Sequence, residues 1–133
     1  MLVTRDNATL IVAESYGIKL TPSISRTTAA SRTDASGLSS ETASPDGICL
    51  DEENAVWYGG VPNRRCVCVR EGGEVLQTIE VDRGCFACAL GGADRRTLFM
   101  MATEWKGPEE MFAEPPTGQV LTANAPAPGV GWP

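Results

Sequence analysis

The sequence predicts an all-β fold built from about three blades of a β-propeller. Short β-branched or alternating segments, bounded by Gly, Pro, Asn or Asp, recur along the 133 residues. No segment shows the periodic apolar face of an amphipathic helix. A turn with an acidic residue, followed directly by an apolar strand, occurs three times, and such a repeat is typical of propeller blades.

The expected strands follow one another in chain order with turn residues between them. Their ranges are 9–15, 47–51, 55–60, 66–71, 74–81, 85–90, 97–103 and 118–125. The weak helix candidate 107–114 lacks a periodic apolar face. The chain is therefore expected to be built from strands throughout.

The repeat is visible in "RDNATLIVAES", "LDEENAVWYGG" and "GADRRTLFMMAT". Thr9, Ala55 and Thr97 hold the same place in the three copies, so the copies are spaced by 46 and 42 residues. Blades of roughly 40–50 residues have this spacing, whereas a small β-sandwich, the competing fold, needs no repeat. Closed propellers have about 4–8 blades, so the array is incomplete and leaves an open face. We expect a second copy or a longer chain to cover that face.

Alternation within the strands predicts which side chains share a face. Cys66 and Cys68 are expected on one face of their strand, and Val67 and Val69 on the other. Trp57 and Tyr58 alternate in the same way. We expect one of the two aromatic rings in a core and the other at a groove or a channel.

Composition excludes several functions. The net charge of −6 and the pI near 4.6 argue against a nucleic-acid partner, which needs a basic face. No apolar run approaches the ~20 residues that cross a bilayer, so no membrane association is expected. The N-terminus carries charges where an export signal needs an apolar core, and five cysteines then fit a reducing cytoplasm. The absence of histidine excludes Ser-His and Cys-His catalysis.

Residues 22–44 interrupt the strand pattern. Eleven of these 23 residues are Ser or Thr and none is aromatic, which is typical of disorder. The segment nevertheless lies where the second half of a blade belongs. The segment can be back-translated into DNA with GC-rich codons and then read one base earlier. The peptide encoded in that frame has the pattern of a strand, a hairpin turn and a second strand with a tryptophan. We therefore interpret 22–44 as a frame-shifted or disordered insert within a propeller region 2–125, with 126–133 as a flexible C-terminal tail.

The cysteines permit a different function. Cys66-x-Cys68 and Cys85-x-x-Cys88 together provide four thiolates, a set that can bind structural zinc. Both pairs lie within regular strands rather than in zinc knuckles, and a free cysteine behaves as a small apolar core residue. Core packing is the preferred interpretation, for Cys49 as well.

Four stretches carry a resemblance to a known family. They are "VTRDNATLIVAESYGIKLT", "PDGICLDEENAVWYGGVPNRRCVCV", "EGGEVLQTIEVDRGCFACALGGADRRTLFM" and "GQVLTANAPAPG". Their order and spacing resemble the C-terminal half of the senescence marker protein, regucalcin, gluconolactonase and luciferin-regenerating-enzyme-like family. The resemblance implies a six-bladed propeller with a divalent metal, calcium or zinc, in its channel. It also implies hydrolysis of lactones and related esters.

The resemblance assigns one site residue in this chain. Asp46, in the turn Pro45-Asp46-Gly47, matches a metal ligand of the family that also serves as a catalytic base. From the residues alone, Asp46 is only a turn former. The other three ligands of the family, a Glu and two Asn, have no counterpart here. We expect a fragment of the hydrolase that is inactive alone and binds no metal tightly, so that whether this chain is an enzyme stays open. The alternative is a non-catalytic propeller remnant that self-associates through its open blade edge.

Overall fold

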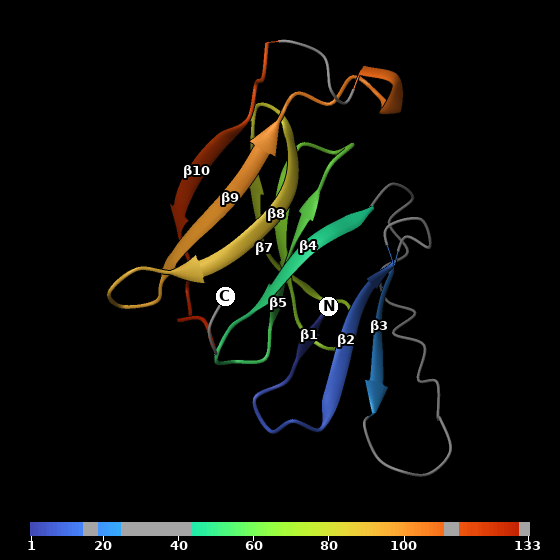
Figure 1. Ribbon diagram of the computed structural model, residues 1–133. Coiled ribbons are helices and arrows are strands. Elements are labelled where there is room, and N and C mark those ends of the chain that lie inside the picture. The colour runs from blue at the N-terminus through green and yellow to red at the C-terminus, as the bar shows by residue number, and fades with distance from the viewer. Residues whose placement is uncertain (15–18, 25–43, 111–114, 131–133) are drawn as a thin grey trace.

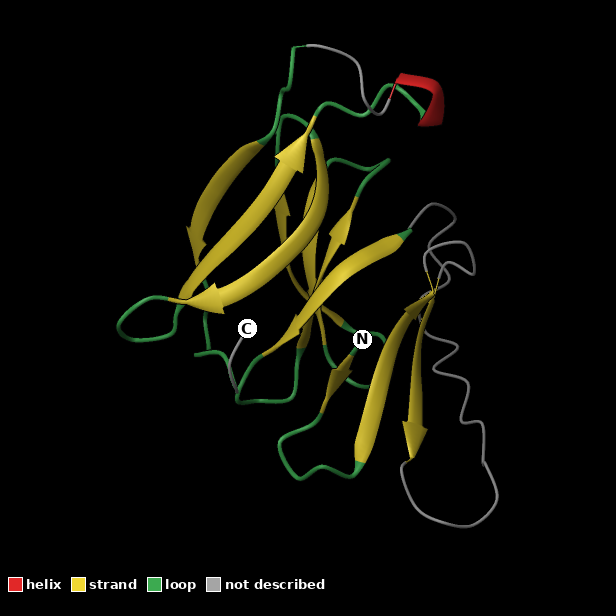
Figure 2. Ribbon diagram, in the orientation of Figure 1, coloured by secondary structure: helices red, strands yellow, loops and turns green. Residues whose placement is uncertain are grey.

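The computed structural model describes residues 1–14, 19–24, 44–110 and 115–130. These residues form ten strands and one short 3-10 turn, η1 (Pro108–Glu110) (Figures 1 and 2). The strands are β1 (Leu2–Val3), β2 (Thr9–Glu14), β3 (Lys19–Ile24), β4 (Pro45–Leu50), β5 (Val56–Gly60), β6 (Arg65–Val69), β7 (Val75–Glu80), β8 (Gly84–Gly91), β9 (Thr97–Thr103) and β10 (Gln119–Asn124).

The strands form three antiparallel meanders. Their orders are β1-β2-β3, β4-β5-β6-β7 and β8-β9-β10, and Figure 1 shows them fanned out so that β4 and β8 lie side by side. We call these meanders blades 1, 2 and 3, and their first strands the inner strands. The prediction of an all-β chain with about three propeller blades is confirmed.

The predicted strands are all present, with ends that differ by at most two residues from those expected. The strand ranges expected from the local pattern did not include β1 or the last part of β3. Pro22 to Ile24 pair with β2 in β3, although we had assigned them to the insert. The rest of that insert, 25–43, lies outside the described residues, so its reading frame stays a prediction. No helix among the described residues has the length and apolarity needed to cross a membrane.

The three repeats share one kind of turn between their first two strands. In each, the fourth residue of the turn donates its backbone N–H to the carbonyl of the first residue, and the residues that donate are Asn7, Asn54 and Arg95. These three also have positive φ angles of 56°, 61° and 60°. Asn tolerates this left-handed conformation better than most residues, but Arg95 does not have that advantage. The sequence repeat thus corresponds to a repeated hairpin.

Blade 2 is buried on both faces. One face forms a core with blade 3 that contains Trp57, Cys66 and Cys68. The other face forms a core with blade 1 that contains Tyr58 and Val67. The predicted alternation of the β6 cysteines and valines is confirmed. The prediction that one of the two aromatic rings faces a groove or channel is wrong, because each ring enters a core between blades.

The C-terminal segment is held in place as far as residue 130. The Val130 N–H donates to the carbonyl of Leu50, and the Gly129 N–H donates to the carbonyl of Arg95. Ala127 is buried. We had predicted a flexible tail from residue 126 on the basis of its Pro, Ala and Gly content. These backbone hydrogen bonds to the turns of blades 2 and 3 correct that prediction for residues 126–130.

Candidate functional site

Asp46 lies in an inner strand, at an irregularity rather than in a free turn. Pro45 pairs with Gly60 and Ile48 pairs with Tyr58, so two residues of β4 oppose the single Gly59 of β5. This arrangement is a β-bulge, which bends a strand and changes the direction of a side chain. The sequence indicated a Pro-Asp-Gly turn before the strand. The structure corrects this, because the three residues are the first residues of β4.

Glycine at the bulge allows blade 3 to approach blade 2. A Cβ atom added at Gly47 would lie 2.6 Å from the Cα of Ala87 in β8, and one at Gly59 would lie 2.6 Å from the carbonyl oxygen of Cys85. Both distances are shorter than any ordinary contact and involve backbone atoms. Asp46 therefore lies beside Gly47 and opposite Gly59, two positions at which a side chain would collide with β8.

Asp46 is exposed to solvent, but partial burial of its carboxyl still raises the pKa above the ordinary value. No hydrogen bond or ion pair to this carboxyl is found within the part of the chain that the structure describes. The negative charge of Asp46 also contributes to a raised pKa of the Cys85 thiol, after a contact with Cys66 and burial. Asp46 thus lies beside the start of β8 and lacks a compensating cation among the described residues.

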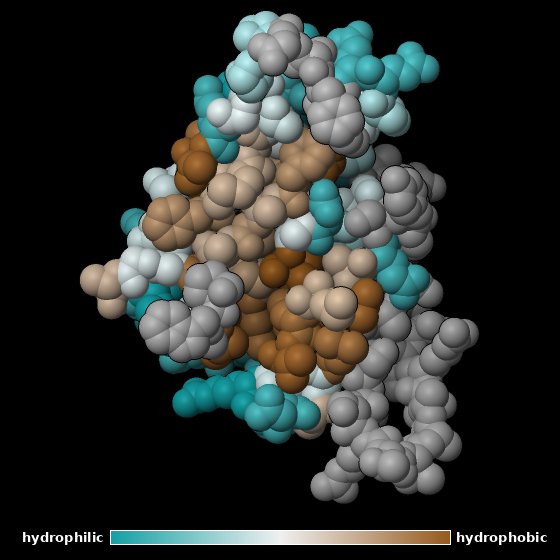
Figure 3. Space-filling model, viewed as in Figure 1, coloured by the Kyte–Doolittle hydropathy of each residue, from teal (hydrophilic) through white to brown (hydrophobic). Residues whose placement is uncertain are grey.

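The inner strands β1, β4 and β8 enclose a pocket of about 530 Å³ at the position of a propeller channel. Its described lining is mostly apolar, with Ile48, Leu90 and Val130 among the contributing residues. Figure 3 shows apolar side chains gathered on this face of the molecule. Arg5 provides the charge in the described lining and Asp46 is not part of it. A cation in this pocket would meet a positive side chain.

Four of the five cysteines meet between the inner strands and β6. The Sγ atoms of Cys49 and Cys88 are 3.7 Å apart, and Cys66 lies near enough to Cys85 and Cys88 for their thiols to lower its pKa. We call Cys49, Cys66, Cys85 and Cys88 the thiol cluster. All five cysteines are free, and no group of three or more His, Cys, Asp or Glu among the described residues has a metal-binding arrangement. This geometry does not support the zinc interpretation.

A second bulge brings the two cysteines of β8 to the same face. Positions i and i+3 of a regular strand point to opposite faces. In β8 the register shifts between Cys85 and Ala87, and both Cys85 and Cys88 then pack in the core between blades 2 and 3. The strand alternation available from the sequence could not predict this placement.

Asp51 is a buried acidic residue that our reading of the sequence did not single out. Its side chain is 1% exposed, and its Oδ1 accepts hydrogen bonds from the backbone N–H groups of Glu53 at 3.0 Å and Ala55 at 2.8 Å. Burial raises the pKa of this carboxyl more than the two hydrogen bonds lower it. The equivalent turns contain Asp6 and Asp94, which accept from backbone N–H groups two residues on. Asp51 therefore stabilises a turn and is no ligand.

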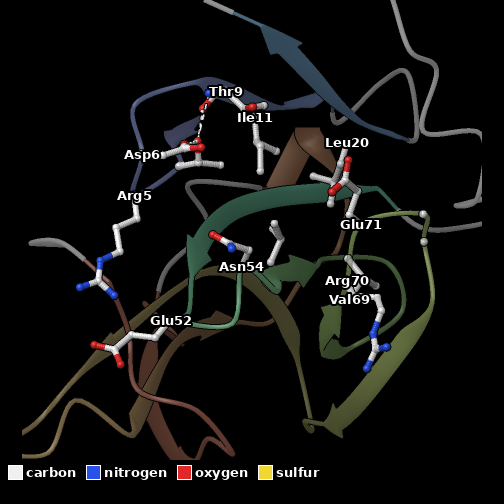
Figure 4. A pocket seen from close by; sticks show the side chains of 14 residues that line it. Arg5, Asp6, Thr9, Ile11, Leu20, Glu52, Asn54, Val69, Arg70 and Glu71 are labelled. Atoms are coloured by element: carbon white, nitrogen blue, oxygen red, sulfur yellow. Dashed lines mark hydrogen bonds between the residues drawn. The ribbon is translucent and has the colours of Figure 1, made fainter.

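A cleft larger than the pocket between the inner strands lies elsewhere, between blades 1 and 2. It has a volume of about 640 Å³ and apolar walls that include Ile11 and Val69. In Figure 4, Arg5 and Glu52 lie toward one end and Arg70 and Glu71 toward the other. These side chains do not converge as a catalytic group would. The cleft does not include Asp46.

The family model for the SMP-30/gluconolactonase/LRE-like region matches residues 1–104. The match covers most of the chain, including β1 to β9 and Asp46. The chain belongs to this family. No curated protein matches it closely.

Solved structures of SMP-30/gluconolactonase/LRE-like type share the fold. A luciferin-regenerating enzyme superimposes with a TM-score of 0.71 at 17% identity, over 96% of this chain and 45% of that protein. Regucalcin from Agrobacterium tumefaciens, described as a calcium-binding protein, has a TM-score of 0.71 at 17% identity, over 98% of this chain and 45% of that protein. The chain thus spans less than half the length of the structures it matches.

The residues of this SMP-30/gluconolactonase/LRE-like chain do not by themselves fit a divalent metal. Calcium takes six to eight oxygen ligands and zinc about four ligands in all. Asp46 belongs to no group of three or more His, Cys, Asp or Glu side chains that could hold a metal among the described residues. A metal at this position would need ligands from elsewhere.

Proposed function

We propose that this chain supplies three blades of a metal-dependent hydrolase that acts on a sugar-type lactone or a similar ester. The observation that carries the proposal is the position of Asp46 in an inner strand of a chain that belongs to the SMP-30/gluconolactonase/LRE-like family. The calcium-binding regucalcin among its structural neighbours supports a divalent metal, calcium or zinc, in the complete propeller.

In this proposal, Asp46 has two roles. Its carboxylate is one ligand of the metal, and it accepts a proton during hydrolysis, as a carboxyl with a raised pKa is suited to do. The bulge and Gly47 position it beside β8. Because Asp46 belongs to no group of three or more His, Cys, Asp or Glu side chains among the described residues, we expect the chain alone to have no metal-dependent activity.

The test begins with the DNA immediately upstream of the codon for Met1. We expect it to encode further propeller strands, in frame or frame-shifted, that include the Asn ligands of the family. The joined protein should hydrolyse a sugar lactone with calcium or zinc, and Asp46→Asn should lower kcat/KM on the order of 100-fold. Glu71→Gln, at an exposed turn, is the control and should have no effect.

Two results would oppose this proposal. Unrelated DNA upstream would remove the expected partner blades. A joined protein whose metal-dependent hydrolysis is unchanged in Asp46→Asn would show that this carboxylate is neither ligand nor base. The same DNA sequence also establishes the reading frame of residues 22–44.

A second candidate function is self-association through blade 3. Leu98, Met100 and Ala102 of β9 are buried, so the alternating residue Met101 points to the opposite face. There it pairs across strands with Val120 of β10, which is 63% exposed. In a closed propeller this face packs against another blade, and a second copy of the chain would cover it.

Light scattering after size exclusion tests this second candidate. We expect a dimer for the wild-type chain and a monomer for Val120→Glu, which places a charge in the contact. Val75→Glu is the matched control, because Val75 is 54% exposed but lies in the outer strand of blade 2, and it should stay dimeric. A wild-type monomer at all concentrations would exclude self-association.

We also propose that the protein works in the cytoplasm. All five of its cysteines are free thiols, including a pair close enough to touch. Such thiols persist in a reducing compartment. Fractionation of the cells that express the protein tests this, and recovery from the extracellular medium would contradict it.

A further inference from the structure

Cys49 and Cys88 form a pair that joins two blades at the channel pocket. Their Sγ atoms are 3.7 Å apart, although 39 residues separate them in the chain. Cys49 belongs to β4 and Cys88 to β8, the inner strands of blades 2 and 3. A disulfide needs its sulfur atoms about 2.0 Å apart, so a small approach of the two strands would allow a bond.

Access to this pair comes from the pocket. Cys49 is only partly buried, and both cysteines contribute to the pocket of about 530 Å³ between the inner strands. Cys66 and Cys85 are fully buried in the core between blades 2 and 3. A small solute in the pocket would therefore meet Cys49 first, with Cys88 directly behind it.

The other two members of the thiol cluster, Cys66 and Cys85, lie in the core behind Cys49 and Cys88. The neighbouring thiols of Cys85 and Cys88 lower the pKa of Cys66. The Cys88 thiol contacts the carbonyl oxygen of Gly47 at 3.5 Å. Contacts with Cys49 and Cys66, together with burial, raise the pKa of Cys88. The argument for Cys88 as the second thiol is its position, because its sulfur lies within contact distance of the Cys49 sulfur that would be modified first.

We propose that Cys49 and Cys88 are a modification site at which a small hydroperoxide forms a reversible disulfide between blades 2 and 3. With hydrogen peroxide, the Cys49 thiolate attacks one peroxide oxygen and the O–O bond breaks. The departing hydroxide takes up the proton that the Cys49 thiol released, so a sulfenic acid and water form. The Cys88 sulfur then attacks the Cys49 sulfur, the S–O bond breaks, and the oxygen leaves as water with the proton of Cys88. Two thiols are oxidised and one peroxide is reduced to two waters.

The purified full chain tests the proposal through thiol counts and peptide mapping. Equimolar hydrogen peroxide should remove two of the five thiols, and the map should place the new bond between Cys49 and Cys88. A thiol reductant should restore both. Oxidation should also raise the unfolding temperature by roughly 10 °C, because the bond closes a long loop of the unfolded chain.

Controls separate this pair from the other cysteines. Cys49→Ser and Cys88→Ser should each prevent the bond, whereas Cys68→Ser should not, because Cys68 is fully buried and is not among the residues that line the pocket. The wild-type chain unfolded in urea provides a second comparison that needs no variant. Without the fold, the pairs that are close in sequence, Cys66 with Cys68 or Cys85 with Cys88, should form instead.

Three outcomes would overturn the proposal. The first is a map that places the bond of the folded chain at Cys66 and Cys85. The second is oxidation that stops at a sulfinic or sulfonic acid of Cys49. The third is faster formation of the Cys49–Cys88 bond in urea than in the folded chain. Each would show that the fold does not direct peroxide to this pair.

Discussion

At the scale of single residues, Asp46 reduces the stability of the fold when it is charged. Burial raises the pKa of its carboxyl in the folded chain, so folding favours the protonated form. The stabilisation from proton binding is complete below the ordinary Asp pKa of 3.8. It is lost as the pH rises through the folded-state pKa, and the charged form is disfavoured at neutral pH.

Asp46→Asn should therefore make the chain more stable at pH 7 than the wild type. The amide has similar size and no charge to desolvate. The gain should disappear near pH 3, where Asp46 is protonated. Thermal unfolding at both pH values measures this, with Glu80→Gln at an exposed position of β7 as the control. A loss of stability at pH 7 would mean that Asp46 has a favourable partner.

Asp51 has the opposite effect, because its side chain completes a turn. Asp51→Ala would remove the acceptor for the N–H groups of Glu53 and Ala55, and Ala55 is buried. We expect a loss of about 1–3 kcal/mol in the free energy of unfolding by urea. Asp51→Asn keeps an acceptor oxygen and should lose less. The exposed neighbour variant Glu52→Gln should change little, and equal losses in all three variants would contradict this role.

At the scale of elements, the glycines at the β4 bulge control how closely blade 3 approaches. Gly47→Ala would place its Cβ against the backbone of Ala87, and Gly59→Ala against that of Cys85. Each should lower the free energy of unfolding by about 1–3 kcal/mol, because backbone atoms must move. Gly118→Ala is the control, since nothing lies within 4 Å of its Cβ position. Urea unfolding distinguishes them, and a neutral Gly47→Ala would disprove the close approach.

Strands were predictable from the sequence, but bulges were not. Local alternation, turn residues and β-branched side chains predicted eight strands. These are β2 and the seven strands of blades 2 and 3. The bulges in β4 and β8 depend on contacts with another blade, which no local pattern encodes. The bulges change which face a side chain occupies. The direction of the Asp46 side chain and the shared face of Cys85 and Cys88 could therefore not be predicted from the sequence.

At the scale of the whole molecule, the repeat spacing predicted the blades, and the resemblance predicted the family. Tyr58 and Val67 could not be assigned to a second core, because the sequence does not show that blade 2 is covered on both sides. The C-terminal tail was predicted to be flexible because its own sequence does not show the hydrogen bonds that hold it. Those of Gly129 and Val130 join backbone atoms of distant turns. Such contacts depend on how the blades pack against one another, which a local sequence pattern does not encode.

The candidate site was predictable only through the family resemblance. Pro45-Asp46-Gly47 is common turn chemistry, and nothing in its local sequence distinguishes a ligand from a turn former. The structure adds that Asp46 is on an inner strand, has a raised pKa and lacks grouped carboxylates among the described residues. The central claim is that this chain contributes one ligand to a metal site that it does not complete.

Calorimetric titration of the purified 133-residue chain with calcium tests that claim most directly. The claim predicts no saturable one-site binding at calcium concentrations up to roughly 1 mM, because one carboxylate replaces too little of the ion's hydration shell. Tight one-site binding by this chain, lost in Asp46→Asn and kept in Glu71→Gln, would contradict it and would mean that the chain holds a complete metal site of its own.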